Sequence, residues 1–459
     1  MRLAIPPAPV NVRSLSLPYR RHLVTTLGGQ ATVLALGVFT GIASARLLGP
    51  QGRGELAALT LWPLILVLLT SFGISQAIVF HSGKQRFAPA EIWTCAVTIW
   101  LAQSAAVLLL GAAVIPLALR HYSPDTRHLA LLFLAFTPVL IFVGYPASLL
   151  QGQLDLLSFN LIRIAAPAVY ALGLAVLALR HQTRLREVLL VQIAGVCLAA
   201  AVGAWRVLSR PQRKPSPAPG PSRPHGLAWN RAACAALLRY GWRSHLSSVT
   251  SYVNQRSDQL LLSLFVGPRD LGLYVVAVAL ATSVSFFPQA AGMVTIAAGS
   301  NLSPQEARPI IARGFRVTLA ALALGCALIF LLCPWLIGLA YGPSYRAAVT
   351  ACRVLLPGTV ALGLNQVLYD GARALERPAL PSYAEGLSTA VTLGGLLLLL
   401  PRLGFLGAAI ASTLAYTASL CLMLRLSRSR LQLGLRELLG GITVRRIERG
   451  LNLLYDPLR

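Results

Sequence analysis

The sequence contains few charged residues. Asp, Glu, Lys and Arg make up 12% of its 459 residues, and hydrophobic residues make up 56%, with a mean hydropathy of +0.67. Soluble globular proteins carry roughly 25% charged residues. So few charges cannot cover the surface of a water-soluble fold of this length. The composition therefore excludes the soluble classes and predicts a protein that crosses the membrane several times.

The sequence also lacks the motifs of several enzyme classes. It contains no GxxxxGK[ST], HExxH, GxSxG or DxD pattern. Its seven cysteines include no CxxC pair and lie mostly in apolar runs, which is typical of small buried hydrophobic residues and not of a metal or redox site. We expect no enzyme activity, no cofactor and no metal. A membrane-bound polymerase or ligase is disfavoured, because the loops expected outside the membrane are too short to hold a catalytic domain.

Acidic residues are scarce compared with basic ones. The chain has 14 Asp and Glu against 40 Lys and Arg, a net charge of +26 and a pI near 11.1. Such a charge often indicates nucleic-acid binding. Here the basic residues lie in short stretches between apolar runs, where they set topology and meet anionic headgroups. We therefore expect anionic membrane lipids as partners, and no nucleic acid.

Twelve apolar windows are long enough to span a bilayer, which takes about 20 residues. They lie at 27–47, 56–80, 92–118, 129–150, 160–179, 188–206, 242–265, 271–298, 314–340, 349–372, 382–400 and 405–424. In or beside the connecting segments, 27 Lys and Arg fall on the side of the termini and 10 on the other side. The positive-inside rule then places both termini in the cytoplasm. Because the basic residues are nearly all Arg, as in GC-rich bacterial genomes, we expect a bacterial inner-membrane protein.

The windows divide the chain into two halves. We expect a cytoplasmic segment at 1–26, a six-helix bundle at 27–206, a Pro- and Arg-rich cytoplasmic linker at 207–241, a second bundle at 242–425 and a basic tail at 426–459. The prolines of the linker exclude a helix and predict a flexible strap. The tail alternates apolar and basic residues, which fits either an amphipathic helix on an anionic leaflet or a disordered segment.

A short motif recurs at the start of each half. Residues 49–54 read GPQGRG and residues 267–272 read GPRDLG, at a constant offset of 218. Both segments follow an odd-numbered helix, so the two halves have the same topology. This pattern predicts an all-α membrane protein built as two parallel-repeat bundles of six helices related by an axis along the membrane normal.

Ionisable residues lie inside several predicted spans. A charge in the bilayer core is costly, so each should face protein or water. They are Arg46, Arg163, Arg256, Asp258, Asp370 and Glu385. Each also has a structural alternative: Arg46 could extend to the membrane surface, the other arginines could brace neighbouring helices, and the acids could pair with arginines, as the i, i+3 spacing of Asp370 and Arg373 allows.

Uncharged polar residues accompany these charges. Ser244, Ser247, Ser251, Asn254 and Asp258 share one helical face, and Asn365, Gln366 and Tyr369 lie within one predicted span. The serines alone would also fit close helix packing. With the arginines, these residues predict a hydrated cationic cavity. Guanidinium groups would bind phosphate in a bidentate manner, and amide and hydroxyl groups would match sugar hydroxyls.

Two segments carry a family resemblance. Residues 45–55 (ARLLGPQGRGE) resemble the first-helix signature of polysaccharide exporters in the MATE-like, or MOP, flippase superfamily. Residues 254–261 (NQRSDQLL), followed by 267–274, resemble the corresponding signature of the second half. The resemblance extends over nearly the whole chain. It is specific for the superfamily and less so for the substrate.

This resemblance implies a function. It implies a flippase that moves an undecaprenyl-pyrophosphate-linked oligosaccharide, such as an O-antigen, capsule or exopolysaccharide repeat unit, to the outer leaflet by alternating access. A polysaccharide polymerase and a chain-length regulator are further candidate partners. The alternative is a cation-coupled multidrug exporter of the same superfamily, with Asp258 as the coupling acid.

The candidate site residues form two groups. For substrate they are Arg46, Arg53, Arg163, Arg256, Asn254, Asn365, Gln366 and Tyr369, of which the resemblance places Arg46, Arg53 and Arg256 near the transport path. For ion coupling or structural ion pairs they are Asp258, Asp370 and Glu385, of which the resemblance also places Asp258 near the transport path.

Overall fold

The computed structural model describes most of the chain. The described residues are 17–180, 184–209, 229–285, 287–289, 292, 304–377 and 379–440. Within these ranges the chain is helical and contains no strand. The predicted all-α class is therefore confirmed.

The chain forms two compact units. The N-terminal unit comprises residues 15–256 and 267–272, and the C-terminal unit comprises residues 257–266 and the chain from 273 onward. The expected boundary between bundles at residue 242 differs from this division, because the first part of one long helix, α8 (Arg231–Phe265), belongs to the N-terminal unit.

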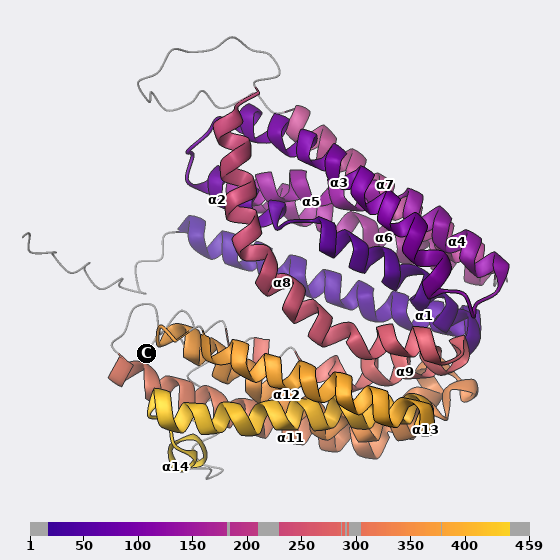
Figure 1. The fold of residues 1–459 in the computed structure, drawn as a ribbon, viewed down its shortest axis with the longest axis vertical. Helices are drawn as coiled ribbons and strands as arrows, with labels where there is room; N and C mark the ends of the chain where they lie inside the picture. The colour runs from indigo at the N-terminus through magenta and orange to yellow at the C-terminus, as the bar shows by residue number, and fades with distance from the viewer. Residues whose placement is uncertain are drawn as a thin grey trace, which may run out of the picture. The chain divides into compact units, whose positions relative to one another are not determined.

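The described part of the N-terminal unit is built from eight helical elements and the first residues of α9 (Pro268–Ala281). The eight elements are α1 (Leu17–Thr70), α2 (Ile74–Gly83), α3 (Pro89–Ala118), α4 (Pro124–Ala135), α5 (Thr137–Gly152), α6 (Leu156–Leu179), α7 (Leu185–Leu208) and the start of α8 (Figure 1). Gly49 interrupts α1 with φ 65° and ψ 178°, a conformation that residues with a Cβ rarely adopt. This break divides α1 into two helical segments, at the place where the sequence separates the windows at 27–47 and 56–80.

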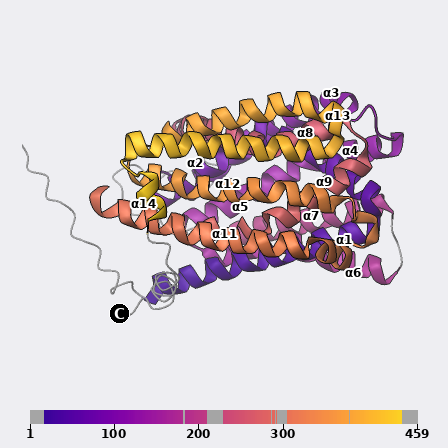
Figure 2. The same ribbon diagram turned by 90° about the horizontal axis from the view of Figure 1, so that it is seen from below.

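The C-terminal unit contains the remaining helices. Its elements are the end of α8, most of α9 (Pro268–Ala281), η2 (Thr282–Ser285), α11 (Pro304–Tyr341), η3 (Pro343–Tyr345), α12 (Ala348–Ala374), α13 (Ala379–Leu426), η4 (Ser427–Leu431) and α14 (Leu435–Leu439). Helices α11, α12 and α13 run side by side (Figure 2). Small residues allow this approach: a Cβ on Gly358 of α12 would lie 2.8 Å from the Cα of Thr413 on α13.

Nine helical stretches in the described part of the chain are long and apolar enough to cross a membrane. The stretch 379–431 contains the predicted spans at 382–400 and 405–424, which are separated by Gly404 (φ 55°). The stretch 28–70 contains most of the spans at 27–47 and 56–80, which are separated by Gly49. The predicted end at residue 80 is wrong, because this helix ends at Thr70 and α2 begins at Ile74. The predicted span at 242–265 lies in α8, which is too polar to be counted. Eleven of the twelve predicted spans therefore overlap these nine stretches, and the twelfth lies in α8.

Helix α8 begins earlier than the sequence pattern predicts. The side-chain oxygen of Asn230 accepts hydrogen bonds from the backbone N–H groups of Ala232 (2.9 Å) and Ala233 (3.3 Å), so Asn230 caps the helix and residues 231–241 of the expected linker are helical. Asn230 also donates to Glu91 on α3 (2.9 Å). Residues 210–228, which contain the prolines, lie outside the described part of the chain.

The beginning of the tail packs against its own unit. Leu431, Leu433 and Leu438 are buried in one cluster with Ile311 and Phe315 of α11. The Arg316 guanidinium donates to the Glu437 carbonyl oxygen at 2.7 Å. Residues 431–438 thus pack their buried leucines against α11, whereas Leu435 and Leu439 of the same tail are exposed. Residues 441–459 lie outside the described part.

Candidate functional site

A line of polar contacts joins α1 and α6 in the N-terminal unit. Arg163 on α6 donates to the Gln30 side-chain oxygen at 2.6 Å, and its guanidinium lies 5.1 Å from the Phe159 ring centroid. One turn away, Asn160 donates to the Thr25 carbonyl oxygen at 3.0 Å. Gly29 leaves the space that the Asn160 amide occupies. These contacts hold the Arg163 guanidinium at a defined position along the helix pair.

The same helix pair carries a second arginine near the break at Gly49. Tyr170 on α6 lies near Ser44 and Arg53 of α1. Arg53 is half-buried, and its buried Nε has no hydrogen-bond partner in the described structure. Arg53 therefore lies near α6 and keeps at least one N–H donor, at Nε, that no described residue accepts.

The structure does not gather the predicted arginines into one cluster. Arg46 and Arg256 are exposed, and Arg163 is half-buried beside Gln30. Gln30 and Arg46 are separated by about 24 Å along α1 at 1.5 Å per residue. The cations are therefore distributed along the length of a membrane-spanning helix. The side chains of Asn254 and of the three serines predicted on its face lie outside the described structure.

Asp258 is the centre of a buried polar cluster in the C-terminal unit. Its Oδ2 accepts a hydrogen bond from the Tyr274 hydroxyl at 2.5 Å and from the Ser412 hydroxyl at 3.4 Å, and its Oδ1 accepts one from the Gln259 backbone N–H at 2.7 Å. Asp258 is 4% exposed and Tyr274 is fully buried. The cluster joins α8, α9 and α13 around one carboxylate, surrounded by oxygen atoms that suit a proton or a small cation.

Asp370 has a different environment. Its Oδ1 accepts from the Arg373 guanidinium at 3.0 Å, and its Oδ2 accepts from the Gln366 amide at 3.0 Å. Gly292 provides the space for the carboxylate. This arrangement favours the structural alternative for Asp370, and it uses the Gln366 amide in the same network. Glu385, on α13, is half-buried.

The other predicted sugar ligands on α12 brace it against α13. Asn365 donates to the Tyr416 carbonyl oxygen at 3.2 Å, and the hydroxyls of Tyr369 and Ser419 are 2.9 Å apart. Both Asn365 and Tyr369 are buried. Their hydrogen bonds therefore lie inside the unit, although the second polar atom of Asn365, Oδ1, has no partner in the described structure.

The two repeated turns meet within the N-terminal unit. The Pro268 carbonyl oxygen faces Gly54, and the Pro50 carbonyl oxygen faces Gly272. Near this contact, burial and the Glu55 carboxylate raise the pKa of Tyr122 in the loop between α3 and α4. The two GPxxxG motifs that define the sequence repeat therefore contact each other.

Sequence reasoning missed several polar partners. Tyr274 follows the second GPxxxG motif, and this position is the signal that could have indicated it. Ser412 and Tyr170 lie in apolar helices with no distinguishing pattern. The structure also joins Cys95 on α3 to Cys234 on α8 by a disulfide, although 139 residues separate them and no spacing rule pairs them. Among the described residues, no group of three or more His, Cys, Asp or Glu could hold a metal ion.

Comparison with known proteins gives both a family match and structural likenesses. The model of a family described as polysaccharide biosynthesis protein matches residues 21–296. No curated protein matches the sequence.

The chain is also similar to solved transporter structures. An inward-facing multidrug resistance MATE family transporter of the MOP superfamily is 14% identical, covering 87% of this chain and 94% of that one with a TM-score of 0.71. The lipid II flippase MurJ in an inward closed conformation is 14% identical, covering 95% and 93% with a TM-score of 0.70. A MOP superfamily transporter from Pyrococcus furiosus Vc1 is 12% identical, covering 90% and 95% with a TM-score of 0.60. The chain therefore has the fold of this superfamily, as its sequence predicts.

Proposed function

The chain belongs to the polysaccharide biosynthesis protein family, and from this premise we propose that it moves a polyprenyl-pyrophosphate-linked oligosaccharide across a bacterial inner membrane. The direction is from the cytoplasmic to the outer leaflet, by alternating access. One observation carries the proposal: helices α1, α6 and α8 of the N-terminal unit bear arginines that are exposed or only half-buried, at Arg46, Arg53, Arg163 and Arg256. Cations at such positions suit a substrate with a strongly anionic headgroup.

The positions of the acids support an anionic substrate over a cationic drug. A cation exporter would present carboxylates to its substrate. In the described structure Asp258 is enclosed by Tyr274 and Ser412, and Asp370 is paired with Arg373. These carboxylates are covered inside the C-terminal unit, whereas the arginines of the N-terminal unit keep accessible surface.

The spacing of the arginines suggests how a pyrophosphate would cross. Arg163, oriented by Gln30, would receive the headgroup near one end of the α1–α6 pair, and Arg46 and Arg53 would hold it near the other end. Guanidinium groups bind phosphate with paired, charge-assisted hydrogen bonds. The substrate would therefore exchange one set of cations for the next and never be a bare anion in the bilayer, while its prenyl tail stays in lipid.

Asp258 is the proposed coupling group. A buried carboxylate that accepts two hydroxyl hydrogen bonds can exchange a proton or a small cation while remaining hydrogen-bonded. Its occupancy would bias the equilibrium between the two conformations of the carrier. The same proposal places both termini in the cytoplasm and makes a polymerase and a chain-length regulator candidate partners.

A leaflet-protection assay tests the substrate assignment. A short-chain polyprenyl-pyrophosphate oligosaccharide is placed in one leaflet of proteoliposomes, and its transfer is scored with an impermeant glycosidase. Arg163→Ala and Arg256→Ala should each reduce the rate at least about tenfold, which is the effect of losing one charge-assisted hydrogen bond. Arg180→Ala, an exposed arginine at the end of α6, is the matched control and should transport normally.

Two outcomes of this assay would contradict the proposal. Normal transfer by both Arg163→Ala and Arg256→Ala would contradict the role of the arginines. Gradient-driven efflux of a cationic dye by the wild type, without transfer of any polyprenyl-linked sugar, would support the multidrug-exporter alternative.

A further inference from the structure

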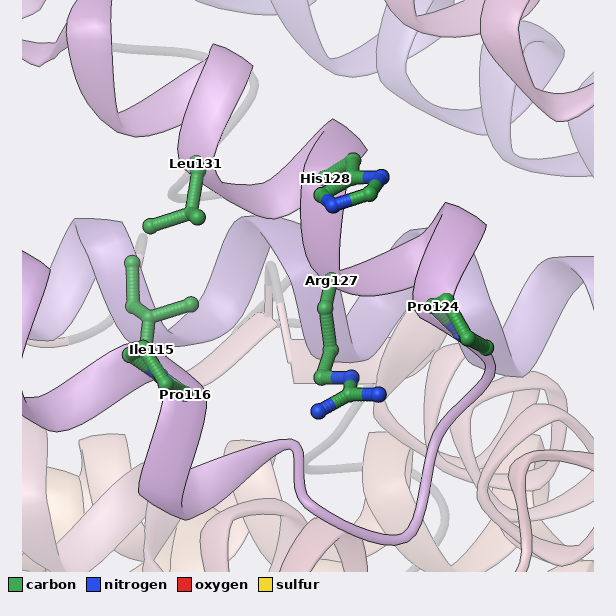
Figure 3. A pocket seen from close by; sticks show the side chains of 6 residues that line it. All are labelled: Ile115, Pro116, Pro124, Arg127, His128 and Leu131. Atoms are coloured by element: carbon green, nitrogen blue, oxygen red, sulfur yellow. The ribbon is translucent and has the colours of Figure 1, made fainter.

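A cavity opens at the corner between α3 and α4 of the N-terminal unit. It has a volume of about 190 Å³ and is lined by Ile115, Pro116, Pro124, Arg127, His128 and Leu131. Figure 3 shows Leu131 facing Ile115 on one side, while the Arg127 side chain extends between Pro116 and Pro124 on the other. The cavity therefore has an apolar part and a cationic part.

Arg127 has unused hydrogen-bonding capacity. Its Nε is buried and has no hydrogen-bond partner in the described structure. The nearest acid in sequence, Asp125, is exposed and lies two residues earlier on α4, so it does not share a face with Arg127. Ser123, which could otherwise approach, accepts from the Thr126 N–H and caps the helix. A guanidinium with a buried, unsatisfied N–H favours an anion.

The position of the cavity limits what that anion can be. Helix α3 ends at Ala118 and α4 begins at Pro124, and each belongs to a stretch that can span a membrane. The corner between them therefore lies at the boundary between the hydrocarbon and the headgroups. Arg127 is in the first turn of α4, where the helix dipole also favours negative charge.

We propose that this corner binds the headgroup phosphate of an anionic glycerophospholipid. Arg127 would bind the phosphate, and the exposed His128 would contact the headgroup. Pro116 and Leu131, which keep accessible surface, would pack against the first methylene groups of an acyl chain. A free phosphate would use only the cationic part. The adjoining apolar wall is therefore the reason for assigning a lipid.

The amount of phospholipid that stays bound to the purified protein tests this proposal. The full chain is purified from membranes, exchanged into mixed micelles of phosphatidylglycerol and phosphatidylcholine, and its bound lipid is counted by native mass spectrometry. Arg127→Gln should lower phosphatidylglycerol occupancy at least about fivefold without changing phosphatidylcholine. Arg120→Gln is the matched control: Arg120 is an exposed arginine of the same loop, where it donates to His121 at 3.0 Å. It should retain normal occupancy.

Two further measurements separate the alternatives. Leu131→Ser, which keeps Arg127, should also lower phosphatidylglycerol occupancy if the acyl chain is bound. Equal loss in Arg127→Gln and Arg120→Gln, or no loss in Arg127→Gln at an unchanged thermal unfolding temperature, would overturn the proposal. Displacement of the lipid by millimolar inorganic phosphate, with Leu131→Ser unaffected, would instead assign a free-anion site and also overturn it.

Discussion

Gly54 and Gly272 lie face to face at the contact of the two repeated turns. A Cβ on Gly54 would lie 2.8 Å from the Gly272 backbone nitrogen, and a Cβ on Gly272 would lie 2.9 Å from the Gly54 backbone nitrogen. The contact is reciprocal, because Gly54 and Gly272 hold equivalent positions in the two GPxxxG motifs and each faces the backbone of the other motif. The two copies of the motif are thus related by a local two-fold axis and meet backbone to backbone.

Substitution of either glycine should separate the turns. Because the neighbouring atoms belong to the backbone and cannot rotate away, Gly54→Ala and Gly272→Ala should each destabilise the protein by about 1–3 kcal/mol. The thermal unfolding temperature in detergent measures this effect. Gly267→Ala is the control in the same turn, since a Cβ there would meet no atom within 4 Å. Equal unfolding temperatures for Gly54→Ala and Gly267→Ala would contradict the observed packing.

The double variant tests whether the two positions share one contact. Once one alanine has separated the turns, the second has less to disrupt. Gly54→Ala/Gly272→Ala should therefore lose clearly less stability than the two single losses combined. Strict additivity would mean that the two glycines act independently.

The two buried acids should respond differently to substitution. Asp258→Asn cannot exchange a proton, so transport should fall at least about tenfold and lose its dependence on the ion gradient. An acceptor kept for Tyr274 turns the amide NH2 group toward the Gln259 N–H, so stability should fall by about 1–3 kcal/mol. Asp370→Asn removes an ion pair in which the Arg373 side chain is 49% exposed, so it should cost about 1 kcal/mol of stability or less and leave transport within about twofold. The proteoliposome assay, run with and without an ion gradient, shows which of the two acids couples transport to the gradient. The reverse pattern would assign coupling to Asp370.

The Cys95–Cys234 pair should act as a cross-link between α3 and α8. The Cα atoms are 5.2 Å apart, a separation that a disulfide requires. Because both cysteines are buried, membranes treated with an oxidant are dissolved in SDS before labelling. Neither thiol should then react with maleimide-polyethylene glycol, and a reductant should restore both gel shifts. The cross-link should add about 2–4 kcal/mol of stability. Cys95→Ser, which leaves Cys234 unpaired, is the control, and maleimide labelling of Cys234 in the oxidised wild type would contradict the pairing.

The start of the tail should contribute to the stability of the C-terminal unit. Leu438 is fully buried, whereas Leu435 in the same short helix is 54% exposed. Leu438→Ala should therefore cost about 2–4 kcal/mol, as for other buried leucines, and Leu435→Ala less than about 0.5 kcal/mol. Chemical or thermal unfolding measures both. Similar values for the two variants would mean that the tail does not pack against α11.

Much of the architecture follows from the sequence because its signals are local. The scarcity of charge predicts a membrane protein, the apolar windows locate the helices, and the offset of 218 between the two GPxxxG motifs predicts the repeat. The glycine at position 49 is required by its positive φ, so the break in α1 is also a local property. The start of α8 was missed because its cap, Asn230, follows a proline-rich stretch, and the pattern predicts a loop to residue 241.

Tertiary structure alone decided which polar groups meet. Residues 139 positions apart form the Cys95–Cys234 bond, and 154 positions separate Asp258 from Ser412. Helical periodicity gives the face of one helix but not the rotation and depth of its neighbour, so it could not pair Arg163 with Gln30 or Asp258 with Tyr274. The sequence by itself thus determined the membrane class, the helices and the repeat, because hydrophobicity and turn conformation act over a few residues. Only the packing of helices determined which arginines keep accessible surface and which acids are enclosed.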